Sequence, residues 1–227
     1  MSRLGYRLLR WAGLALGIAA IPLTVHADST ITIFNTFGPG HSFNCCAGFG
    51  EAGSDYMPNA FTWAMAFTPS TTSPLFAIDV AIAGVSNQFT LALMTSNSGL
   101  PGSILESWTL TTTFVPGLCG HCFETVFSTQ HLVLQAGTQY WLVPFPSSNM
   151  DGAWMQNNVG ASGTAAFSLD SGKTWTLNPK SDMGAFDVRG ISSTTVPEPS
   201  TFGFMATGLA GIIGVIRRKR KKLLLLM

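Results

Sequence analysis

Apolar and polar residues alternate one by one through most of the chain between residues 28 and 193. Phe76, Ile78, Val80 and Ile82, for example, occupy every second position of one segment. A period of two is typical of a β-strand that buries one face and leaves the other wet. The same pattern recurs in residues 31–34, 61–67, 89–93, 105–112, 125–127, 131–134, 139–145, 153–156, 165–169 and 185–189.

Glycine and proline separate these segments. Residues 97–102 form a compact turn cluster, and further turn signals lie at residues 115–117 and 170–172. Short strands divided by such turns, with almost no helical period, predict an all-β fold. We expect one domain over residues 28–193, built as an antiparallel β-sandwich or jelly roll.

The N-terminus has the pattern of a secretory signal peptide. Arg3, Arg7 and Arg10 precede an apolar run over residues 11–23, and Val25-His26-Ala27 is a small-x-small cleavage site. We predict a signal peptide over residues 1–27. An uncleaved N-terminal anchor is the alternative.

The C-terminus combines a Pro-Glu-Pro sequence, an apolar run and a basic cluster. Val196-Pro197-Glu198-Pro199 lies in a predicted linker over residues 194–200, where the prolines exclude a helix. Residues 201–216 carry no charge and predict one transmembrane helix, although a full span takes about 20 residues. Six consecutive cations follow at residues 217–222, so residues 217–227 are predicted to form a cytoplasmic tail.

This C-terminal order resembles the PEP-CTERM sorting signal. The resemblance implies export across the inner membrane and transient anchoring by the C-terminal helix. It also implies processing by exosortase, a membrane protease–transpeptidase, and then a place at the cell surface or in the extracellular matrix. The sorting residues would be Val196, Pro197, Glu198 and Pro199.

The central segment resembles the choice-of-anchor domains of exported bacterial proteins. The resemblance rests on SNSGLPGSILESWTL at residues 96–110, GTQYWLVP at residues 137–144 and GAFDVRG at residues 184–190. It implies no activity and assigns no functional residue.

Charge excludes one class of partner. Residues 28–200 hold three cations and all eleven acidic residues, a net charge of 3 − 11 = −8. Nucleic-acid binding needs clustered lysine and arginine, so we expect no nucleic-acid partner.

Four cysteines lie in the exported segment: Cys45, Cys46, Cys119 and Cys122. An even number in an oxidising compartment favours two disulfides, and we expect the first pair to bond the second pair in either register. Closing a loop of about 75 residues would stabilise the fold by roughly 4 kcal/mol. Redox catalysis by Cys119-Gly120-His121-Cys122 and zinc binding with His41 or His121 are the alternatives.

No catalytic motif stands out, so we predict neither an enzyme nor a cofactor or metal site. A glycosidase pair among Glu51, Asp55, Glu106 and Glu124 is weighed against scattered solvent-facing acids, which we favour. A calcium site at Asp151 or Asp170 lacks a known ligand spacing.

Two tryptophans near loops, Trp154 and Trp175, are candidate platforms for stacking sugar rings. We therefore predict an exported non-catalytic surface or extracellular-matrix-associated protein. Its partners would be exosortase and, as a candidate, extracellular polysaccharide. The alternative is a carbohydrate-binding or carbohydrate-active exported enzyme.

Overall fold

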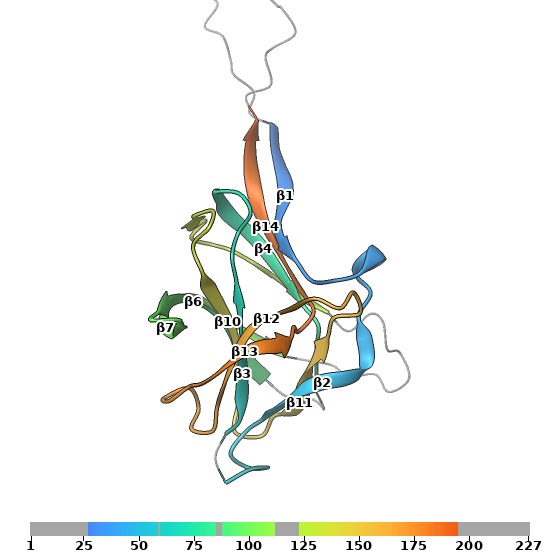
Figure 1. Ribbon diagram of the computed structural model, residues 1–227, viewed down its shortest axis with the longest axis vertical. Helices are drawn as coiled ribbons and strands as arrows, with labels where there is room; N and C mark the ends of the chain where they lie inside the picture. The colour runs from blue at the N-terminus through green and yellow to red at the C-terminus, as the bar shows by residue number, and fades with distance from the viewer. Residues whose placement is uncertain (1–26, 59, 85–87, 112–122, 195–227) are drawn as a thin grey trace, which may run out of the picture. The chain divides into compact units, whose positions relative to one another are not determined.

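The computed structural model describes residues 27–58, 60–84, 88–111 and 123–194 (Figure 1). Residues Asp28–Ser193 form one compact unit. The predicted signal peptide, the sorting residues 196–199 and the predicted membrane span at residues 201–216 lie outside the described residues. Within the described part, no helix is long and apolar enough to cross a membrane.

The described part is built of β-strands, with one 3₁₀ turn, η1 (Pro39–His41), and this confirms the all-β prediction. The strands form three sheets, and apart from the β1–β14 pair the neighbouring strands in them are antiparallel. The five-stranded sheet has the order β1 (Ala27–Asn35), β14 (Phe186–Thr194), β4 (Ser73–Val80) and β8 (Glu124–Phe127), with β9 (Val133–Leu134) also on β4. The six-stranded sheet has the order β13 (Thr176–Asp182), β12 (Ser162–Ser168), β3 (Thr62–Phe67), β10 (Tyr140–Pro146), β6 (Gln88–Asn97) and β7 (Leu100–Thr111). The three-stranded sheet has the order β2 (Asn44–Ala52), β11 (Asp151–Gln156) and β5 (Ile82–Gly84).

The main core draws on all three sheets. Ile78 and Val80 of β4 are fully buried with Leu93 of β6, Leu142 of β10 and Trp154 of β11. These positions follow the alternation in the sequence, because successive side chains of a strand point to opposite faces. Burying apolar surface of this kind is the dominant favourable contribution to folding.

The expectation that each sheet keeps one wet face is wrong for the centre of the six-stranded sheet. Trp141 and Val143 of β10 are as buried as Leu142 between them. They pack in a second cluster with the small side chains of Ala64, Ala66, Ala92 and Ala166. The indole of Trp141 covers these alanines, so both faces of the central strands are apolar.

Two strands were not anticipated from the sequence. These are β2, which carries Cys45, and β13, which contains Pro179. Proline cannot donate to a sheet ladder, and β13 is an edge strand, where proline is tolerated. The predicted turn over residues 97–102 is shorter: only Ser98 and Gly99 have positive φ, of 52° and 81°, and β7 begins at Leu100.

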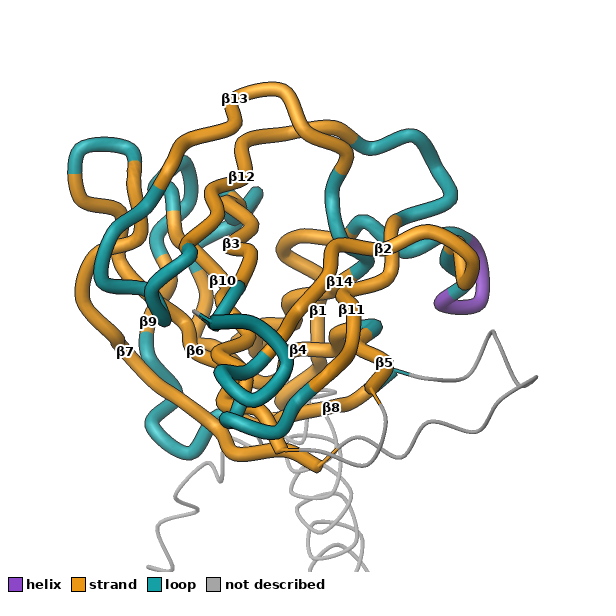
Figure 2. Tube along the Cα trace, turned by 90° about the horizontal axis from the view of Figure 1, so that it is seen from below, coloured by secondary structure: helices purple, strands orange, loops and turns teal. Residues whose placement is uncertain are grey.

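The first and last strands of the domain, β1 and β14, are neighbours in one sheet and lie side by side in Figure 1. Figure 2 shows η1 at one side of the domain, next to β2. The loop that carries η1 joins β1 to β2 and brings His41 towards β4 and β14.

Candidate functional site

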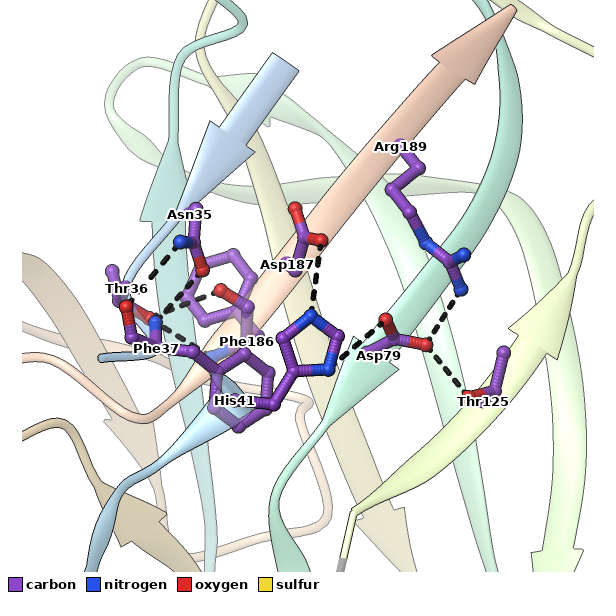
Figure 3. Close-up of polar contacts among 9 residues, drawn as sticks. All are labelled: Asn35, Thr36, Phe37, His41, Asp79, Thr125, Phe186, Asp187 and Arg189. Carbon is purple, nitrogen blue, oxygen red and sulfur yellow. Dashed lines mark hydrogen bonds and ion pairs between the residues drawn. The ribbon is translucent and has the colours of Figure 1, made fainter. Parts of the chain in front are cut away.

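A row of polar side chains crosses the five-stranded sheet. Asp187 of β14 and Asp79 of β4 are direct partners in the antiparallel register, and Asp79 is also paired with Thr125 of β8. Residues opposite one another project from the same face of a sheet, so the three side chains lie together. Arg189, two residues after Asp187 on β14, lies on this face as well (Figure 3).

One oxygen of Asp79 is fully occupied. Thr125 Oγ1 donates to Asp79 Oδ1 at 2.6 Å, and a terminal nitrogen of Arg189 donates to the same atom at 2.8 Å. The other oxygen, Oδ2, faces His41, whose Nδ1 is 4.0 Å away. His41 Nε2 is also 4.0 Å from Asp187 Oδ2. Both separations are too long for hydrogen bonds, so the imidazole lies between two carboxylates without bonding either.

Both carboxylates are removed from water. Asp79 is 1% exposed and Asp187 is 3% exposed. Oδ1 of Asp187 is buried and has no hydrogen-bond partner. Burial, and then the negative charge of Asp79, raise the pKa of Asp187 to about 6. Electrostatic interactions with Arg189 and His41 and a side-chain hydrogen bond with Thr32 of β1 lower this pKa in part.

Aromatic rings hold His41 in position. The ring of Phe37 stacks on the imidazole at 5.2 Å, and the ring of Phe123 meets it edge-on at 5.2 Å. His41 has a φ of 57° at the end of η1, a region that only a few residue types adopt readily. Its side chain is 41% exposed, so the ring forms the solvent side of the cluster.

A second candidate site is a polar pocket of about 600 Å³ beside Trp175. The β6–β7 hairpin contributes Asn97, Ser103 and other residues to the lining, and the segment before β13 contributes Lys173 and Trp175. Trp175 is half-buried, and its ring meets Phe145 edge-on at 6.4 Å. The predicted platform at Trp175 therefore borders a hollow that has polar side chains around it.

The prediction that Trp154 is an exposed platform is wrong. Its side chain is fully buried, and Nε1 donates to the carbonyl of Ala185 at 3.1 Å. The ring packs on Phe186 at 5.5 Å. Trp154 lies at the centre of β11, between β2 and β5, and that placement directs its side chain into the core.

We favoured the interpretation that the four candidate glycosidase acids face solvent, and for two of them this is wrong. Glu51 is fully buried, and the backbone N–H of Trp63 donates to its two oxygens at 3.1 and 3.3 Å. Glu106 is 4% exposed and accepts from Ser128 Oγ at 2.7 Å and from the Thr129 N–H at 2.8 Å. Asp55 is exposed, and Glu124 is half-buried. Burial raises the pKa of Glu51 well above its usual value, although the Trp63 and Thr62 hydrogen bonds oppose this.

Neither calcium candidate shows a ligand shell. Asp170 organises its own turn: Thr174 N–H and Ser168 Oγ donate to Oδ1 at 2.8 and 2.7 Å. Hydrogen bonds from Thr174 come first among the causes that lower its pKa to about 2. Asp151 is exposed at the start of β11.

The predicted disulfides fall largely outside the described side chains, which include Cys45 but not Cys46, Cys119 or Cys122. Cys45 packs against a small cluster formed by Phe37, Phe43, Ala81 and Ala185. Phe123, which directly follows Cys122 in the chain, packs against the same cluster.

Asp79, Thr125, Asp187 and Arg189 were not among the site residues predicted from the sequence. A signal was present, because Ile78-Asp79-Val80 and Phe186-Asp187-Val188 each place an aspartate between two apolar residues within a strand. The alternation assigned these aspartates to a wet face, which the segment of Phe37 and His41 covers.

Comparison with known proteins identifies the C-terminal tail. Residues 195–221 match the PEP-CTERM protein-sorting motif. The motif marks the chain as an exported protein that exosortase sorts, with transient membrane anchoring through the C-terminal tail. No curated protein and no solved structure matches the chain.

Proposed function

We propose that this chain is a non-catalytic protein of the cell surface or extracellular matrix, and that its β-sandwich domain binds extracellular polysaccharide beside Trp175. The sorting motif at residues 195–221 supports the envelope location. The observation that carries the binding role is the polar pocket of about 600 Å³ with Trp175 in its wall.

The chemistry of this pocket suits a neutral or weakly acidic sugar chain. A sugar ring has an apolar face that packs on an indole and a rim of hydroxyl groups that need hydrogen-bond partners. Trp175 supplies the aromatic surface, while the exposed Asn97 and Lys173 supply donors from two separate segments of the lining. An open hollow of this kind accepts one segment of a long polymer without enclosing its ends.

The buried acids support a role without turnover. A glycosidase needs two carboxyl groups directed at one glycosidic bond. Glu51 and Glu106 are instead directed at backbone and hydroxyl donors inside the fold, and the lining of the Trp175 pocket contains neither residue.

Binding of the full-length chain to purified exopolysaccharide, measured by affinity electrophoresis, tests the proposal. Trp175→Ala should weaken binding by about 1–3 kcal/mol, if sugar stacking is comparable to base stacking on aromatic rings. Asn97→Ala should also weaken binding, and it leaves the Phe145–Trp175 contact untouched. Tyr56→Ala is the matched control, because this aromatic ring is 57% exposed and does not line the pocket.

Unchanged binding in both pocket variants would exclude the pocket as the site. Steady hydrolysis of a polysaccharide by the pure chain, abolished by one carboxylate substitution, would overturn the non-catalytic role in favour of an exported carbohydrate-active enzyme.

A further inference from the structure

Three side chains from distant parts of the sequence bring metal-ligating atoms together. One atom each from His41, Asp79 and Asp187 lies within 4.8 Å of the other two. Ligands of a tetrahedral zinc ion at its usual bond lengths are about 3.4 Å apart, so modest inward movement would bring these three atoms to ligand spacing and leave a fourth position for water. His41 can supply that movement, because it is at the end of a short turn and its side chain is 41% exposed.

The buried carboxylate of Asp187 is the second observation. It is 3% exposed, its Oδ1 has no partner, and its Oδ2 has His41 Nε2 at 4.0 Å. Figure 3 shows Asp187 directing one oxygen at His41. Thr32 gives Asp187 one side-chain hydrogen bond, but two buried carboxylates still face one another here with a single arginine, which pairs with Asp79. Burying charge that is not fully compensated is costly, so a second cation at this position would stabilise the pair.

The hydrogen bond of Arg189 goes to Asp79 and not to Asp187. Its terminal nitrogen donates to Asp79 Oδ1 at 2.8 Å, on the side away from His41, while its buried Nε has no partner. Thr125 donates to the same Oδ1. The two donors fix the orientation of Asp79 and leave Oδ2 directed at His41, as outer hydrogen bonds do for metal-ligating carboxylates.

We propose that His41, Asp79 and Asp187 bind a divalent transition-metal ion of the zinc and manganese class. One imidazole nitrogen and two carboxylate oxygens form a mixed donor set: imidazole suits zinc and similar ions, and carboxylate suits manganese. Calcium and magnesium prefer shells made of oxygen alone. The ion would neutralise the two facing aspartates and join η1 to β4 and β14.

The test uses Mn²⁺ as the probe, because thiolates favour softer metals and the four cysteines then compete weakly. The full-length chain is purified in detergent, stripped with a chelator and titrated while electron paramagnetic resonance follows free Mn²⁺. We expect saturable binding at a single site, competition by Zn²⁺, and a nitrogen coupling from the imidazole of His41.

Two variants remove ligands with little other change. Asp187→Asn keeps the shape of the side chain, and His41→Asn suits a backbone with φ of 57°, where asparagine is well tolerated. Each should weaken Mn²⁺ binding about tenfold or more, since even loss of an outer-shell partner costs 10–100-fold. His41→Asn should also abolish the nitrogen coupling.

Matched controls are Asp182→Asn, at an exposed aspartate, and His131→Asn, at a histidine with φ of 48°. Both should bind as the unchanged chain does. Absence of saturable Mn²⁺ and Zn²⁺ binding would overturn the proposal, as would full binding by folded Asp187→Asn and His41→Asn. If Asp187→Asn does not fold, the Mn²⁺ affinity of His41→Asn decides whether the proposal holds, because this substitution alters no buried carboxylate.

Discussion

Asp79 and Asp187 are direct cross-strand partners in the β4–β14 pair, and both are almost fully buried. Like charges directly opposite one another destabilise a sheet. Arg189 offsets part of this cost through its 2.8 Å hydrogen bond to Asp79. The stability of this sheet therefore depends on a charge balance among residues that lie far apart in the sequence.

Removing the cation should reveal that balance. Arg189→Ala leaves two buried carboxylates without an opposite charge, and we expect a loss of about 3 kcal/mol in the free energy of unfolding. Adding Asp187→Asn to Arg189→Ala should restore about 1 kcal/mol or more, because one of the facing charges is gone. Chelator-treated protein unfolded in urea provides the measurement. Equal stability of the single and double variants would contradict the balance.

Glu51 should make the domain less stable as pH rises. Its folded pKa is raised by burial above the ordinary value of 4.5, so the unfolded chain loses its proton first. Below about pH 4.5 Glu51 is protonated in both the folded and the unfolded chain, so it does not lower the free energy of unfolding. Above this pH the free energy of unfolding falls as pH rises, until the folded pKa of Glu51 is passed. Glu51→Gln should remove this component and be more stable than the unchanged chain at pH 8. Asp55→Asn, at an exposed acid, should keep the pH dependence, measured by denaturant unfolding from pH 4 to 8.

The core position of Trp154 predicts a large loss on truncation. Trp154→Ala should cost about 3–5 kcal/mol, since it deletes a fully buried ring and its hydrogen bond to Ala185. Gly184→Ala should also destabilise, by about 1–3 kcal/mol, because a Cβ at Gly184 would meet Trp154 Nε1 at 2.6 Å. Thermal unfolding followed by calorimetry measures both. Trp154→Ala with unchanged stability would place the ring outside the core.

The cysteines should be oxidised. Cys45 and Phe123 pack against the same small cluster, and Phe123 directly follows Cys122 in the sequence. Non-reducing peptide mapping of the exported chain should join a peptide with Cys45 and Cys46 to one with Cys119 and Cys122. Four titratable thiols, or one zinc per chain that remains bound in the His41→Asn variant and is released by thiol reagents without denaturation, would contradict this.

Processing at the tail should remove the membrane segment. Mass spectrometry of the chain from its native envelope should show no peptides from residues 201–216 in the surface fraction, because exosortase acts at the sorting motif. In a strain without exosortase these peptides should remain. Their presence in the surface fraction of the unaltered strain would indicate a permanent anchor.

The alternation of apolar residues was sufficient to predict most strands, including β4, β6 and β10. It missed β2, whose sequence is rich in glycine and other small residues, and β13, whose Pro179 is typical of a break. Local pattern could not anticipate these, because their pairing partners in β11 and β12 stabilise them.

The candidate site depended on information that the sequence does not carry locally. Asp79 and Asp187 meet because of the β4–β14 register, and His41 reaches them from the β1–β2 connection. The alternation of apolar and polar residues predicted that Asp79 faces solvent. In the structure Asp79 is buried, because the segment with Phe37 and His41 covers that face of the sheet. The sorting motif was readable because it is linear and needs no tertiary contact.

The neighbouring positions of β1 and β14 have a consequence for the timing of export. Thr36 Oγ1, directly after β1, donates to the carbonyl of Gly184 and accepts from the N–H of Phe186, across sequence separations of 148 and 150 residues. A chain that crosses a membrane from its N-terminus delivers β1 first and β14 last, so the sheet stays open until translocation is nearly over. Long-range closure of this kind is slow. A tail that pauses in the membrane would hold β14 near the exit site while β1 and β4 find it, so transient anchoring would serve as a folding interval before release.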